Sequence, residues 1–222
     1  MSVVVDVVSV FVDERGEYGN KLGIVRSSDA TRGREQAIAA TLGFSETVFL
    51  DRDGDGAVQI FTPAAELPFA GHPCVGTAWW LRTTGAPVTA LRVKAGEVGV
   101  RYEDELTWIS ADPSWTSTFS WSEVDSPGVL AAVDPDSFTE GHNYVYAWLD
   151  REAGDVVSRM FAPVLGIRED QATGAAAIRF TAHVDRDLTI RQGLGSVLRT
   201  HRLPGGRVEV GGRTRFVEQL TI

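Results

Sequence analysis

Few residues of this 222-residue chain have types that commonly do chemistry. Cys74 is the single cysteine, so it can form neither an intrachain disulfide nor a thiolate metal site. The sequence carries no signature of a zinc deaminase, a nucleophile elbow, a Walker loop or a dinucleotide-binding loop. The histidines share no short motif and are His72, His142, His183 and His201. What remains is acid/base chemistry by carboxylates and a histidine.

Composition narrows the classes of partner. The chain has 30 acidic and 21 basic residues, a formal net charge of −9. Nucleic-acid affinity depends on clustered Lys and Arg, so we expect no nucleic-acid partner. No apolar run approaches the roughly 20 residues that cross a bilayer, and residues 3–13 read as a buried strand rather than a leader. We therefore expect a cytoplasmic protein without a membrane partner.

An internal repeat relates two stretches of the chain, residues 58–81 and 157–180. Each has an apolar strand that ends in Phe, then one residue, then Pro, then a loop with an acid, and then a Gly that opens a helix. The matched landmarks are Phe61 with Phe161, Pro63 with Pro163, and Gly71 with Gly174. The repeat predicts two structurally similar halves, residues 1–108 and 109–222, each built of strands and a helix.

Local signals predict the elements that hold the candidate residues. Residues 47–50 and 58–61 read as strands that flank the Asp-Gly turn chemistry of residues 51–56. This acidic loop is a hairpin turn rather than a calcium loop, because its twelfth position is Thr62 instead of Glu. Helix start and stop signals predict helices over residues 33–44, 73–84 and 175–184.

The last two helices each follow a glycine, Gly71 or Gly174. Helix N-termini offer free N–H groups and a positive dipole end, so two of them at one cleft would suit an anion. A glycine before a helix also serves a tight turn, and the sequence leaves both interpretations open. Glu46 precedes a strand, His72 starts a helix, and Asp170 lies in the matching loop. If the halves pack face to face, these three side chains can converge.

Several short motifs, taken together, resemble the phenazine-biosynthesis PhzF-like family. They are Gly19-Asn20, Ser45-Glu46-Thr47-Val48-Phe49, Phe61-Thr62-Pro63, Leu67-Pro68-Phe69-Ala70-Gly71-His72-Pro73, Met160-Phe161-Ala162-Pro163, Glu169-Asp170-Gln171-Ala172-Thr173-Gly174 and Gln192-Gly193. The resemblance implies an α+β fold similar to that of the diaminopimelate epimerases. Such a fold has two pseudo-symmetric halves, each a curled, mostly antiparallel sheet or barrel around a central helix, with the active site between them.

The resemblance also implies an activity. It indicates an isomerase or epimerase that uses neither cofactor nor metal and moves a carbon-bound proton on a small amino- or hydroxy-carboxylic acid. Glu46 matches the acid/base of the family, and His72 and Asp170 match the residues that position the substrate and handle protons. Ala70 and Thr173 stand where the epimerases have two cysteines, which disfavours a two-thiol racemase. The expected substrate-binding residues are Asn20, Gly71, Pro73, Thr173, Gly174, Ala175 and Gly193.

Departures from the family pattern keep other functions open. Gln171 replaces the usual Pro, Ala175 replaces the usual Ser, and the segment between Trp108 and Met160 is short for the family. The alternatives are a catalytically inactive protein that binds small acids on the same scaffold, and a lyase or hydrolase of small metabolites. The resemblance implies a homodimer, and the six Trp of the chain add weak support because aromatic residues are enriched at interfaces.

Overall fold

The computed structural model describes residues 2–51 and 56–222. In this part of the chain, fifteen strands form one mixed, unclosed sheet. The strands are β1 (Val4–Val12), β2 (Asn20–Arg26), β3 (Glu46–Leu50), β4 (Val58–Phe61), β5 (Glu66–Leu67), β6 (Ala90–Val93), β7 (Gly96–Glu103), β8 (Leu106–Ala111), β9 (Ser120–Glu123), β10 (Asn143–Asp150), β11 (Asp155–Ala162), β12 (Ile167–Asp170), β13 (Leu188–Gln192), β14 (Ser196–Arg202) and β15 (Val208–Thr221).

Four helices lie against this sheet in the described ranges, and three of them confirm the predicted positions with small shifts at their ends, whereas the helix at Pro127–Ala131 was not predicted. They are α1 (Glu35–Leu42), α2 (Gly71–Thr83), α3 (Pro127–Ala131) and α4 (Gly174–Val184), with short 3-10 turns at Pro113–Trp115, Pro135–Ser137, Pro163–Leu165 and Pro204–Gly206. The prediction placed the start of α2 at Pro73, two residues too late. A proline is tolerated anywhere in a first helical turn, because the N–H that it lacks has no partner there.

The first strand confirms the expectation of a buried strand within residues 3–13, apart from the exposed Val4 and the half-buried Asp6 and Asp13. Val8 and Val10 of β1 belong to the main core, whereas Val5 and Val7 belong to a second core under α1. The register of β1 against β15 shifts between Val7 and Val8. Such an irregularity turns the strand, so both of its faces are covered and its valine-rich run needs no polar alternation.

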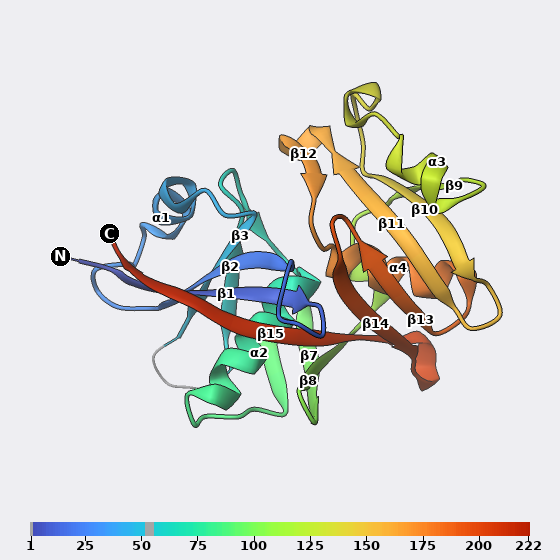
Figure 1. Ribbon diagram of the computed structural model, residues 1–222. Helices are drawn as coiled ribbons and strands as arrows, with labels where there is room; N and C mark the ends of the chain where they lie inside the picture. The colour runs from blue at the N-terminus through green and yellow to red at the C-terminus, as the bar shows by residue number, and fades with distance from the viewer. Residues whose placement is uncertain (1, 52–55) are drawn as a thin grey trace.

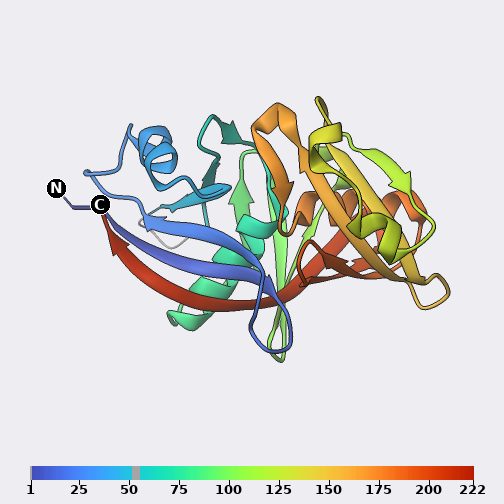
Figure 2. The same cartoon turned by 45° about the horizontal axis from the view of Figure 1, so that its top comes forward.

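The two lobes of the molecule each surround one helix, as the predicted fold class requires (Figure 1). In the first lobe α2 packs against β1, β2, β3, β8 and β15, and in the second lobe α4 packs against β14 and β15. Strand β15 runs along both lobes, which both views show (Figures 1 and 2). Its first residues pair with β8 and β14, and its later residues pair with β1. This shared strand holds the lobes in fixed register.

Three further expectations concern boundaries and location. Strands β3 and β4 pair antiparallel, as a hairpin requires, but most of its turn, residues 52–55, lies outside the described residues. The expected boundary after Trp108 falls inside β8, and β15 pairs with strands of both lobes, so the division into residues 1–108 and 109–222 stays a prediction. No helix in the described ranges is long and apolar enough to cross a membrane.

Candidate active site

Glu46 and His72 form a close pair in the interior of the first lobe. Glu46 is the first residue of β3, opposite Leu22 of the parallel strand β2. His72 is the second residue of α2, and its Nδ1 lies 3.1 Å from Oε2 of Glu46. The His72 side chain is 3% exposed and that of Glu46 is 16% exposed. The Glu46 side chain is therefore the more exposed member of the pair, although its Oε2 is buried.

Each member of this pair has a buried polar atom without a hydrogen-bond partner among the described residues. The contact between Glu46 Oε2 and His72 Nδ1 is short but lies outside hydrogen-bond geometry. His72 Nε2 is buried and has no hydrogen-bond partner among the residues that the structure describes. Unsatisfied buried polar atoms are rare in folded proteins because they cost free energy, and they concentrate where a ligand or water completes them.

Asp170 reaches the same region from the second lobe. It ends β12, whose register against β11 places it opposite Met160. Its Oδ1 accepts a hydrogen bond from Asn20 Nδ2 at 2.8 Å, and its Oδ2 accepts one from Thr173 Oγ1 at 2.5 Å. Asn20 begins β2 in the first lobe, so this carboxylate joins the lobes through side chains.

Gly71 and Gly174 bring the first turns of α2 and α4 into direct contact. A Cβ on Gly71 would lie 2.7 Å from the carbonyl carbon of Gly174, and a Cβ on Gly174 would lie 2.8 Å from the backbone nitrogen of His72. Among the described residues no side chain caps either helix. Both helices therefore direct free N–H groups and positive dipole ends to one junction.

The three titratable side chains influence one another strongly. Burial raises the pKa of Glu46, but the charge and hydrogen-bonding capacity of His72 outweigh it, so the net pKa is lowered. Burial lowers the pKa of His72, but the carboxylates of Glu46 and Asp170 outweigh it and the net pKa is raised. Burial and the charge of Glu46 raise the pKa of Asp170 to about 6. The lowered pKa of Glu46 keeps it a carboxylate at neutral pH, and the raised pKa of His72 favours the charged form of the imidazole beside it.

The Glu46–His72 pair makes stability depend on pH. Because the pKa of His72 is raised above 6.5 in the folded protein, its contribution is fully present below pH 6.5 and is lost as pH rises through the folded value. We expect His72→Asn to cost more unfolding free energy at pH 5.5 than at pH 9, with a difference of about 1–3 kcal/mol. Urea unfolding at both pH values measures it. An equal cost at both would show that the pair carries no net charge interaction.

The remaining predicted binding residues lie at or near this junction. Pro73 is buried in the first turn of α2, and Ala175 is half-buried in that of α4, with its backbone nitrogen 3.0 Å from the position of a Gly71 Cβ. Gly193 lies farther along, on the turn after β13, where its backbone nitrogen bonds to the Ser158 carbonyl. Asn20 and Thr173 bond directly to Asp170, whereas a Cβ on Gly193 would lie 3.2 Å from the carbonyl oxygen of Gln171, the residue after Asp170.

Two residues of the network were not predicted as site residues. Ser45 Oγ donates to Asn20 Oδ1 at 3.1 Å, and Gln192 bonds to Thr173 through both ends of its amide. Both stand in motifs that carry the resemblance, beside Glu46 and Gly193. Their signal in the sequence was a polar residue next to a predicted site residue, which without tertiary contacts is also typical of a solvated surface.

Hollow regions and aromatic residues do not by themselves mark this site. A cavity of about 610 Å³ lies at β4 and β6 and is lined in part by Gln59, Val93 and Lys94, but Glu46, His72 and Asp170 do not line it. This cavity lacks the paired acid and histidine that acid/base chemistry needs. Trp115 packs on Phe69, and Trp121 packs on Phe180, within the chain. These tryptophans thus give no support for the homodimer, which stays a prediction.

The chain is similar to known proteins over most of its length. A family model described as phenazine biosynthesis-like protein matches residues 8–127 and 130–204. The trans-2,3-dihydro-3-hydroxyanthranilate isomerase of Pseudomonas aeruginosa is 29% identical over an alignment of 215 residues. The match covers 79% of this chain and 77% of the relative. The isomerase of the same name from Pseudomonas chlororaphis is 30% identical over 199 residues, which cover 72% of each chain.

Solved structures share the fold. A PhzF-family protein of Bacillus anthracis superposes with a TM-score of 0.81 at 19% identity, covering 100% of this chain and 99% of its own. A hydroxyproline epimerase of Agrobacterium vitis superposes with a TM-score of 0.62 at 12% identity, covering 100% and 92%. The α+β, epimerase-like architecture is thereby confirmed. Since the family model matches most of the chain and the relatives carry isomerase names, the chain belongs to the phenazine biosynthesis-like (PhzC-PhzF) family, a family of isomerases.

Proposed function

We propose that this isomerase moves a carbon-bound proton on a small amino- or hydroxy-carboxylic acid, with Glu46 as the acid/base. The observation that carries the proposal is the Glu46–His72 pair, 3.1 Å apart and largely buried, at the junction of the two lobes. The Glu46 side chain is more exposed than that of His72, so Glu46 is the member of the pair that can meet a substrate from solvent. The P. aeruginosa relative is named for a hydroxyanthranilate, which is consistent with a substrate of this class.

The proposed step needs more than a base. The lowered pKa of Glu46 makes it a weak base toward a carbon acid, so the site must stabilise the negative charge that develops on the substrate. The free N–H groups of the first turns of α2 and α4 meet at Gly71 and Gly174 and would supply that stabilisation. His72 would balance the charge of Glu46 and, with Asp170, position the substrate.

The site would lie in a cleft between two halves, residues 1–108 and 109–222, each contributing one helix N-terminus. Asn20, Pro73, Thr173, Ala175 and Gly193 would complete the binding surface. We propose a homodimer as the working assembly. The placement of the site between the halves is supported by the contact of Gly71 with Gly174 and by the bond of Asn20 to Asp170, which both span the lobes.

Proton NMR in D₂O tests the proposal. The protein is incubated with a panel of amino, hydroxy and unsaturated acids, and the same panel without protein is the control. We expect one class of acid to lose a C–H signal without a change other than deuteration or isomerisation. Binding without any exchange would support an inactive acid-binding protein instead, and a product of different composition would indicate a lyase or hydrolase.

A further inference from the structure

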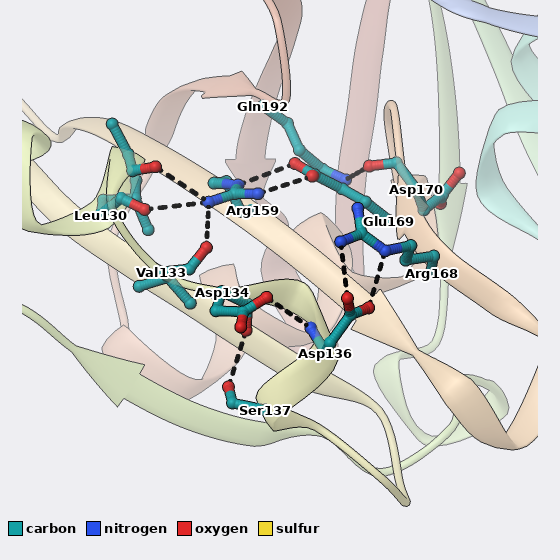
Figure 3. Close-up of polar contacts among 11 residues, drawn as sticks. Leu130, Val133, Asp134, Asp136, Ser137, Arg159, Arg168, Glu169, Asp170 and Gln192 are labelled. Carbon is teal, nitrogen blue, oxygen red and sulfur yellow. Dashed lines mark hydrogen bonds and ion pairs between the residues drawn. The ribbon is translucent and has the colours of Figure 1, made fainter.

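Gln192 is a fully buried amide at the end of β13 that the proposed mechanism leaves unused. Its Nε2 donates to the Asp170 carbonyl oxygen at 3.0 Å, a bond drawn in Figure 3, and to Thr173 Oγ1 at 2.8 Å. Its Oε1 accepts a hydrogen bond from the Thr173 backbone nitrogen at 3.1 Å. Both ends of the amide are therefore committed to the segment that carries Asp170.

Backbone groups fix which way this amide points. A backbone N–H can only donate and a carbonyl oxygen can only accept, so Oε1 must face the Thr173 nitrogen and Nε2 must face the Asp170 carbonyl. Thr173 Oγ1 then accepts a hydrogen bond from Gln192 Nε2. Its own single proton is left for Asp170 Oδ2, 2.5 Å away. Gln192 thus sets the direction of the Thr173 hydroxyl.

The other carboxylate oxygen is fixed in the same way from the first lobe. Asn20 Nδ2 donates to Asp170 Oδ1 at 2.8 Å and to the Ala172 carbonyl at 3.3 Å, and the carbonyl fixes the orientation of the Asn20 amide. Both oxygens of Asp170 therefore face donors, an arrangement that suits an ionised carboxylate. The charged groups that act on Asp170 are Glu46 on β3, which opposes ionisation, and His72 on α2, which favours it.

We propose that Gln192 is a positioning residue that acts through Thr173 to hold Asp170 as an ionised, hydrogen-bond-accepting carboxylate next to the Glu46–His72 pair. The inference rests on the proposed function in taking Asp170 as part of the site. Without Gln192 the Thr173 hydroxyl is free to turn, and the donor that opposes protonation of Asp170 is no longer held in place.

Carboxyl ¹³C NMR of the intact, substrate-free protein tests this role. In Gln192→Met, which keeps the length of the side chain and removes its donors, we expect the Asp170 titration midpoint to rise by about one pH unit. Asp170→Asn identifies the signal. The matched control is Thr181→Val. Thr181 lies in α4 away from the site, and its buried hydroxyl contacts the Thr200 hydroxyl at 2.6 Å. It should leave the Asp170 midpoint where it is in the unmodified protein.

An unchanged or lowered midpoint in folded Gln192→Met overturns the proposal. If that variant does not fold, Thr173→Val removes the hydroxyl through which Gln192 acts on Asp170 and must raise the midpoint, or the proposal fails. Once a substrate is known, the acid limb of the pH–rate profile should move upward with the midpoint, and kcat should fall about tenfold with KM little changed. Because the titration needs no substrate, a positive D₂O exchange with an unmoved midpoint would reject Gln192 alone and leave the proposed function standing.

Discussion

We expect the Glu46→Gln variant to stay folded and to lose the exchange of a substrate C–H proton. The amide keeps the size of the side chain but cannot take up a proton, and general acid/base groups contribute about 10²–10⁴-fold to rate. We therefore expect exchange to fall by about that factor in the D₂O assay. Thermal unfolding of the variant, followed by circular dichroism, establishes that the loss is chemical.

Glu66→Gln is the matched control for this substitution. Glu66 is also a partly buried strand glutamate with a cationic partner, Lys94 Nζ at 2.8 Å, but it lies on β5 and away from His72. Its replacement should leave exchange within about twofold of the unmodified protein, since ion pairs of this exposure contribute little. If Glu46→Gln retained exchange similar to that of Glu66→Gln, another residue would have to be the base.

The sequence predicted those parts of the site that local signals determine. Gly71 and Gly174 marked equivalent helix starts through the internal repeat, and the structure confirms that each opens a helix. Strand β3 begins at Glu46, and it forms because the β-branched and aromatic residues after Glu46 favour an extended, buried chain. The contact between the two helix starts was foreseen only as a condition, namely that the halves pack face to face.

Long-range pairing could not be predicted in this way. Strand β15 pairs with β1 at the opposite end of the chain, and no local pattern specifies a partner so distant in sequence. The same holds for the bond between Asn20 and Asp170, and for the two-ended contact of Gln192 with Thr173. In the sequence, these polar side chains are typical of a solvated surface. In the folded protein they are buried or partly buried, and each buried donor and acceptor then needs a partner.

The contact between the two helix starts makes Gly71→Ala strongly disruptive. The added Cβ would lie 2.7 Å from the Gly174 carbonyl carbon and 3.0 Å from the Ala175 nitrogen, and both atoms are backbone that cannot turn aside. The helices must separate, so we expect a loss of about 2–3 kcal/mol in unfolding free energy. Because an ångström of displacement at a reacting centre can cost about 10²-fold, exchange should fall by a similar factor.

Gly128→Ala shows what the same substitution does where space is available. Gly128 lies in α3, and the nearest atom to its added Cβ would be Ser126 Oγ at 3.7 Å, an ordinary contact. Ala favours a helix over Gly by up to about 1 kcal/mol, so this variant should be as stable as the parent or more so. Urea unfolding and D₂O exchange of both variants measure the contrast. Equal behaviour of the two would mean that the helix starts tolerate separation, and that their close contact is not what holds the N–H groups at the junction.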